Sequence, residues 1–171
     1  MSASLLLSEF TNAIGEQYVL DQDKDKDPYL TDWGKRYRGR ALAVLKPKNT
    51  DEVAVLVGIC KAHRISIVPQ GGNTGLCGGA TPDGTGNSVV ICLSRLNQIR
   101  DVDTQNSTIT VGAGAILKHV QNAALEHGKL FPLSLAAEGS CTIGGNLTTN
   151  AGGIQVLRYG NMRDLTLGLE V

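Results

Sequence analysis

The 171-residue sequence predicts an α+β fold divided into two small lobes. Apolar periodicity gives a strand, helix, strand order over residues 41–93 and a hairpin followed by a helix over 99–126, after which regular periodicity largely disappears. We therefore expect three segments, namely an N-terminal helix with a linker, a first lobe and the start of a second lobe, at residues 1–40, 41–112 and 113–171.

The N-terminal segment is expected to begin with a short amphipathic helix at 3–14, followed by a charged, solvated linker at 21–28. The basic stretch at 35–40 surrounds Tyr37 and is expected to be solvated or to dock on a lobe. Trp33, the only tryptophan, is expected to anchor this stretch on the core.

The first lobe is predicted to open with a strand at 41–45 and a helix capped by Asn49 or Thr50. Glu52 is placed for a capping box with the cap residue. The apolar residues of this helix predict a buried stripe, formed by Val53, Leu56, Val57 and Cys60.

Strands at 65–68 and 89–93 flank a long glycine-rich loop and predict a sheet that starts parallel. A hairpin is predicted over 99–111, followed by a helix over 115–126. The strand pattern returns at Thr166–Val171.

Composition excludes several classes of function. Sixteen basic and sixteen acidic side chains give a formal net charge of zero, which lacks the electrostatic field of a dedicated nucleic-acid binder. No apolar stretch is long enough to span a bilayer, and the apolar run at 4–7 is short and lacks a basic leader. Nucleic acid is therefore not expected as a partner, and no membrane span is expected.

The four cysteines are far apart and form no CxxC pair. This spacing supports neither a disulfide framework nor a zinc site, and no metal ligand is predicted. Reduced thiols favour a cytoplasmic protein, with organellar or peripheral membrane association left open. The cysteines are Cys60, Cys77, Cys92 and Cys141.

The loop PQGGNTGLCGG at 69–79 suggests an anion site. Seven glycines lie from Gly71 to Gly86, and at roughly 0.4–1 kcal/mol each they lower the stability by about 3–7 kcal/mol. Glycine lets backbone N–H groups approach an anionic oxygen closely, and each charge-assisted hydrogen bond contributes about 1.5–3 kcal/mol. Asn73 and Thr74 can add side-chain contacts. A pyrophosphate would offset the loss, while a plain surface loop with turn glycines remains the alternative.

A second glycine cluster, GSCTIGGNLTTNAGG at 139–153, favours one extended ligand held between the lobes. Other nucleotide motifs fit less well. Neither cluster contains the Lys-Ser or Lys-Thr pair of a P-loop. GAGAIL at 112–117 places Leu117 where a dinucleotide fingerprint has its third glycine, which disfavours a nicotinamide cofactor.

Taken together, the motifs resemble the FAD-binding domain of the vanillyl-alcohol oxidase and p-cresol methylhydroxylase superfamily, within it the D-2-hydroxyacid dehydrogenase branch. The resemblance implies a two-lobed p-cresol methylhydroxylase-type fold that is incomplete at its C-terminus, in an N-terminal fragment without the substrate domain. It rests on KPKNTDEVA at 46–54, VPQGGNTGL at 68–76, FPLSLAAEGSCTIGGNLTTNAGG at 131–153, RYG at 158–160 and LGLEV at 167–171.

The resemblance further implies that the first loop wraps the FAD pyrophosphate and that the second cluster lies along the flavin and ribityl portion. The implied cofactor-binding residues of the first loop are Pro69, Gly71, Gly72, Asn73, Thr74, Gly75 and Leu76. Those of the second cluster are Gly139, Ser140, Ile143, Gly144, Gly145, Asn146, Thr149 and Gly152. Some relatives attach flavin through a histidine at the position of Asn73, so this chain is expected to bind FAD non-covalently.

The implied function is the FAD-binding portion of a dehydrogenase that oxidises a D-2-hydroxy acid, such as D-lactate, glycolate or D-2-hydroxyglutarate, to the 2-oxo acid. The substrate-binding and catalytic groups would lie in a later domain, so no catalytic residue is assigned and the chain alone is expected to be inactive. The electron acceptor is unknown. Two alternatives stay open, a nucleotide-binding module without redox activity and a sugar or alcohol flavin oxidase of the same superfamily.

Overall fold

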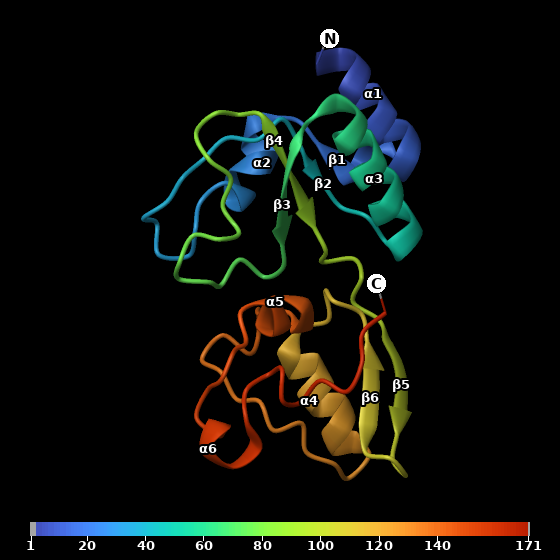
Figure 1. The fold of residues 1–171 in the computed structure, drawn as a ribbon, viewed down its shortest axis with the longest axis vertical. Helices are drawn as coiled ribbons and strands as arrows, with labels where there is room; N and C mark the ends of the chain where they lie inside the picture. The colour runs from blue at the N-terminus through green and yellow to red at the C-terminus, as the bar shows by residue number, and fades with distance from the viewer. Residues whose placement is uncertain (1–2, 171) are drawn as a thin grey trace. The chain divides into compact units, whose positions relative to one another are not determined.

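The computed structural model describes residues 3–170 and divides into two compact units that join between Arg95 and Leu96 (Figure 1). This boundary precedes the expected one at 112 and 113. The predicted hairpin belongs to the second unit because Ile109 and Val111 pack against that unit's core. The first 40 residues are not a separate segment either, since their apolar side chains enter the core of the first unit.

The first unit contains a four-stranded sheet in the order β1-β2-β4-β3. Its strands are β1 (Val19–Leu20), β2 (Val44–Leu45), β3 (Ser66–Gln70) and β4 (Ser88–Cys92). Strand β4 runs parallel to both β2 and β3, whereas β1 pairs antiparallel with β2 at the edge. The predicted parallel start is confirmed, although the strand expected at 41–45 forms ladder pairs only at its last two residues.

Two helices of the first unit lie side by side in Figure 1, α1 (Ala3–Ile14) and α3 (Thr50–His63). The predicted helix at 3–14 is confirmed. The side-chain oxygen of Asn49 accepts a hydrogen bond from the Glu52 N–H at 2.9 Å, so Asn49 is the cap. The Glu52 carboxylate accepts from the Lys48 N–H at 2.8 Å, so the reciprocal bond of the predicted capping box is shifted to the residue before the cap.

Strand β4 separates two apolar clusters because successive side chains point to opposite faces of a sheet. Val89 and Ile91 pack with Phe10 from α1 and Leu56 from α3. On the other face, Val90 and Cys92 pack with Val44, Leu30 and Ala41. All five residues of β4 are buried.

The stripe predicted for α3 is only partly correct. Leu56 and Cys60 are fully buried, but Val57 is 42% exposed. Val57 lies about 100° around the helix from Leu56, so it leaves the face that contacts the sheet. Ile59 packs against the core in its place.

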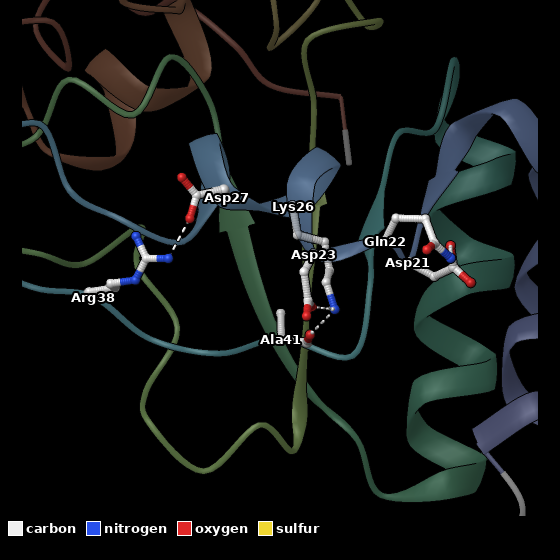
Figure 2. A network of polar contacts seen from close by, with 7 residues as sticks. All are labelled: Asp21, Gln22, Asp23, Lys26, Asp27, Arg38 and Ala41. Carbon is white, nitrogen blue, oxygen red and sulfur yellow. Dashed lines mark hydrogen bonds and ion pairs between the residues drawn. The ribbon is translucent and has the colours of Figure 1, made fainter.

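The segment at 21–28 is exposed as predicted, except for Lys26, but it is folded and not an extended linker. It forms α2 (Asp23–Lys26), followed by a 3₁₀ turn at Asp27–Tyr29. Figure 2 shows Lys26 between Asp23 and the Ala41 carbonyl, each 3.2 Å from its Nζ atom. Lys26 is buried because these two oxygens satisfy its ammonium group.

The anchor predicted for residues 35–40 is wrong. Trp33 is 69% exposed, and the residue that enters the core from this part of the chain is Leu30. Asp32 explains the difference, because its carboxylate holds the neighbouring turn by accepting from the N–H groups of Gly34 and Tyr37.

The second unit is built on the hairpin of β5 (Ile99–Asp103) and β6 (Thr108–Val111). Three helices follow, α4 (Leu117–Glu126), α5 (Ile143–Thr148) and α6 (Val156–Tyr159). The hairpin and α4 are confirmed. The buried core consists of Ala115, Leu117, Val120, Leu133, Cys141, Ile143 and Met162.

The strand predicted at Thr166–Val171 is absent from residues 166–170, and Val171 lies outside the described residues. A strand requires a partner for its backbone N–H and C=O groups, and no ladder partner is paired with residues 166–170. An ion pair between Arg100 and Glu170, at 2.6 Å, ties this stretch to β5.

We expect Phe10→Ala to lower the free energy of unfolding of the first unit by about 3–5 kcal/mol, because Phe10 is fully buried between α3 and the sheet. Leu5→Ala is the matched control in the same helix, where the side chain is 53% exposed, and it should cost less than about 1 kcal/mol. Urea unfolding followed by circular dichroism measures both. Equal costs would contradict the placement of α1 in the core.

Candidate functional site

The glycine loop follows β3, and it is marked by N–H groups that donate no hydrogen bond within the first unit. No N–H from Gly71 to Cys77 donates to an acceptor among residues 3–95. The base of the loop is closed on either side, where the Leu93 N–H donates to the Gln70 carbonyl and the Thr81 N–H to the Gly78 carbonyl. Backbone N–H groups without a protein partner are available as donors to an anionic oxygen. The loop therefore fits the pyrophosphate expected from its sequence.

Side chains hold this loop where its own backbone does not. The Gln70 amide donates to the carbonyls of Tyr29, at 2.9 Å, and Ala80, at 2.7 Å. The Asn73 amide donates to the Thr31 carbonyl at 2.8 Å. The Arg36 guanidinium donates to the Leu76 carbonyl, also at 2.8 Å. The loop is thus fixed from the preceding part of the chain.

Asn73 has a conformational role as well as a polar one. Its φ is +51°, in the left-handed region that asparagine tolerates better than most residues. One hydrogen of its Nδ2 atom is donated to the Thr31 carbonyl, which leaves the second hydrogen and Oδ1 for a ligand. Thr74 is half-buried, and the other end of the loop, at Leu76, is exposed.

Gly75 has no structural reason to be glycine within its own unit. A Cβ added there would meet nothing within 4 Å, and its φ is not in the positive range. A glycine of this kind is suited to close approach of a ligand to the backbone.

The second glycine cluster is more deeply involved in packing. Ile143 is a core residue, and its N–H donates to the Ala115 carbonyl at 2.9 Å. The Gly144 N–H donates to the Ala113 carbonyl at 2.8 Å, and a Cβ on Gly144 would lie 2.8 Å from the Ala113 Cβ. The structure therefore gives Ile143 and Gly144 a role in joining α5 to the segment before α4.

The remaining predicted residues of this cluster differ in exposure. Gly139 and Ser140 are exposed, and a Cβ on Gly139 would meet nothing within 4 Å. Asn146 is buried, with its amide 3.5 Å from the Cys141 sulfur. The Thr149 hydroxyl donates to the Gly145 carbonyl at 3.0 Å. Gly152 lies against Asn161, whose Oδ1 would be 2.7 Å from an added Cβ.

Sequence reasoning missed three polar groups near these clusters. Gln70 is buried and closes the base of the first loop, and its signal was a polar residue ending an apolar strand directly before two glycines. Thr142 caps α5 in extended conformation, but its hydroxyl oxygen is buried with no hydrogen-bond partner among the described residues. Thr81, just after the first loop, has the same kind of unsatisfied hydroxyl.

Hydrogen bonds and burial shift the pKa values of Asp32, Cys60 and Cys141. Hydrogen bonds to the carboxylate, above all from the Tyr37 N–H, hold the pKa of Asp32 below its usual value. Burial raises the pKa of Cys60 to about 11 and also raises the pKa of Cys141. Cys77 is the exposed thiol, whereas Cys92 is buried.

Two of the three histidines lie at helix ends. His63 ends α3 and lies 2.9 Å from the Glu9 carboxylate of α1, and His127 follows the last residue of α4. Across residues 3–170, no group of three or more His, Cys, Asp or Glu side chains is arranged to hold a metal ion. Nor does that part of the chain contain a helix with the length and apolar character needed to cross a bilayer.

Comparison with known proteins decides the family. The model of the family described as "FAD binding domain" matches residues 41–171, which is most of the chain. This chain belongs to that family. The match begins well after α1 and the buried Lys26, so the FAD-binding domain as matched omits part of the first unit's core.

Two relatives share the sequence over most of this FAD-binding chain. The D-2-hydroxyglutarate dehydrogenase of Xanthomonas citri is 44% identical over 86% of the chain and 31% of its own length. The mitochondrial D-2-hydroxyglutarate dehydrogenase of Arabidopsis thaliana is 38% identical over 96% of the chain and 29% of its own length. The chain thus spans about 30% of these relatives, which belong to the branch that the motifs predicted. The mitochondrial name of the Arabidopsis relative does not support the cytoplasmic expectation.

A solved structure of p-cresol methylhydroxylase with substrate bound matches with a TM-score of 0.74 at 22% identity, over 88% of this chain and 30% of that one. The predicted p-cresol methylhydroxylase-type fold is confirmed. FAD as the cofactor of this domain agrees with the family match.

Gly144→Ala and Gly139→Ala should separate packing from exposure in the second cluster. We expect Gly144→Ala to destabilise the second unit by about 1–3 kcal/mol, because its Cβ would overlap Ala113. Gly139→Ala should change the free energy of unfolding by less than about 0.5 kcal/mol. Urea unfolding without FAD measures both, and a stable Gly144→Ala protein would refute the packing role.

Thiol labelling should distinguish one cysteine from the other three. At pH 8 we expect one thiol per native chain, Cys77, to react rapidly with Ellman's reagent, and four to react in denaturant. Cys60 stays protonated at this pH because burial raises its pKa to about 11. Rapid labelling of a second thiol in the native chain would show that one of the buried cysteines is accessible.

Proposed function

We propose that this chain is the FAD-binding portion of a flavin-dependent dehydrogenase that oxidises a D-2-hydroxy acid to the 2-oxo acid. The observation that carries the proposal is the row of N–H groups from Gly71 to Cys77 that have no partner within the first unit, directly after the parallel strand β3. The names of the Xanthomonas and Arabidopsis relatives support the substrate class.

The first loop would hold the pyrophosphate through backbone N–H groups and the Thr74 side chain, without a basic side chain of its own. Among the predicted residues of the second cluster, Gly139, Ser140, Gly145 and Thr149 are the ones we propose for contact with the rest of FAD. When bound, FAD supplies the acceptor for the hydride equivalent of the substrate carbon. The chain's own contribution is binding and orientation.

We propose that FAD is bound without a covalent link. No histidine lies in the first loop, and the Asn73 side chain is turned to the Thr31 carbonyl. Denaturation in acid should therefore release all the flavin into the supernatant, and yellow colour on the precipitated polypeptide would refute this part of the proposal.

The four free cysteines favour a reducing compartment. Because the Arabidopsis relative is named as mitochondrial, the proposed location includes the mitochondrion as well as the cytoplasm.

Gly75→Ala tests the loop directly. The added methyl group meets no protein atom within 4 Å, so the free energy of unfolding should stay within about 0.5 kcal/mol, while FAD binding weakens at least about tenfold. Flavin fluorescence titration gives the affinity. Gly58→Ala, which also meets nothing within 4 Å but lies in α3, is the matched control and should bind FAD normally.

Equal FAD affinity in the Gly75 and Gly58 variants would contradict the loop assignment. The activity is tested on the full-length natural protein. If that protein binds FAD yet reduces no dye with D-2-hydroxyglutarate, D-lactate or glycolate, the dehydrogenase proposal fails while FAD binding stands.

A further inference from the structure

We infer that residues 29–40, which precede the matched FAD-binding domain, form part of the FAD site by holding the glycine loop in its binding conformation, with Arg36 as a positioning residue. This inference rests on the proposed role of the loop in binding FAD. The family match begins at residue 41 and does not include this segment.

Segment 29–40 is itself an ordered turn. The backbones of Thr31 and Arg38 form an antiparallel bridge, and the Asp32 N–H donates to the Tyr37 carbonyl at 3.0 Å. The buried Asp32 carboxylate accepts from the Tyr37 N–H at 2.7 Å and from the Gly34 N–H at 3.1 Å. These bonds fix the turn that carries Arg36.

The turn is also tied to the rest of the first unit on its other side. Figure 2 shows the Arg38 guanidinium in contact with the Asp27 carboxylate, and Lys26 donating to the Ala41 carbonyl. The Arg40 N–H donates to the Asp83 carbonyl at 2.8 Å. The segment can therefore act as a fixed support for a loop that is rich in glycine.

The contacts between the segment and the loop are all made by side-chain donors and backbone carbonyl acceptors. Gln70 and Asn73 donate through side-chain amides to carbonyls of Tyr29 and Thr31, and Arg36 donates to the Leu76 carbonyl. None of these bonds uses a loop N–H group. The loop is thus ordered at both ends and in the middle, while every N–H from Gly71 to Cys77 remains available to an anion.

These bonds reduce the conformational entropy that the loop would lose when it binds FAD. A glycine-rich loop that is mobile before binding must be ordered by its ligand, which weakens affinity. Bonds from segment 29–40 order the loop in advance, so less of the interaction with FAD is spent on ordering it.

The test compares Arg36→Met with Lys35→Met. Both variants remove one positive charge from exposed neighbouring positions of the turn, but only Arg36 contacts the loop. The ¹⁵N heteronuclear NOE of residues 71–77, measured on the FAD-free chain, reports the order of the loop. Fluorescence titration reports the affinity for FAD.

We expect Arg36→Met to lower the NOE values across the loop and to weaken FAD binding about tenfold, with Lys35→Met unchanged in both. Unchanged NOE values in Arg36→Met would overturn the positioning role, because a direct contact between Arg36 and FAD would alter affinity alone. Lower NOE values with unchanged affinity would overturn the link between loop order and binding.

The experiments distinguish a failure of the proposed FAD-binding function from a failure of the positioning role of Arg36. If neither the unmutated chain nor the full-length natural protein binds FAD, the proposed function is wrong, and the NOE comparison still decides whether Arg36 orders the loop.

Discussion

Burial of β4 on both faces is the constraint on which the first unit depends. Its odd-numbered residues pack under α1 and α3, and its even-numbered residues pack against Leu30, Ala41 and Val44. Because β4 pairs with β2 and β3 at the same time, it also fixes where β3 ends. The glycine loop begins at that end, so the packing of two apolar clusters determines where this polar loop starts.

In the glycine loop, the groups that hold the conformation are different from the groups that are free to bind an anion. A loop that satisfied its own N–H groups in turns would be stable but would have nothing left for an anion. Here side-chain amides, a guanidinium and carbonyl oxygens provide the order, and the N–H groups stay free. The second cluster follows a different design, since the N–H groups of Ile143 and Gly144 bond to the backbone before α4.

The elements that could be predicted are those whose signal is local. The helix at 3–14, the Asn49 cap, strand β3 and the hairpin follow from periodicity and capping chemistry, and the two glycine clusters follow from composition. The errors arise where a distant partner decides. Lys26 is buried by the Ala41 carbonyl, Trp33 is displaced from the core by the turn that Asp32 holds, and residues 166–170 lack a strand partner.

The packing of α1 has a consequence for how this domain is handled. A polypeptide trimmed to the matched family border at residue 41 would keep β2 and β4 but lose Phe10 and Leu30, which cover their opposite faces. Val89 and Ile91 would keep α3 but lose the cover of α1, Val44 and Val90 would lose Leu30, and the edge of β2 where β1 had paired would be uncovered. Such a surface favours aggregation between chains. The matched family border thus lies some forty residues after the start of α1, a helix that belongs to the core of the first unit.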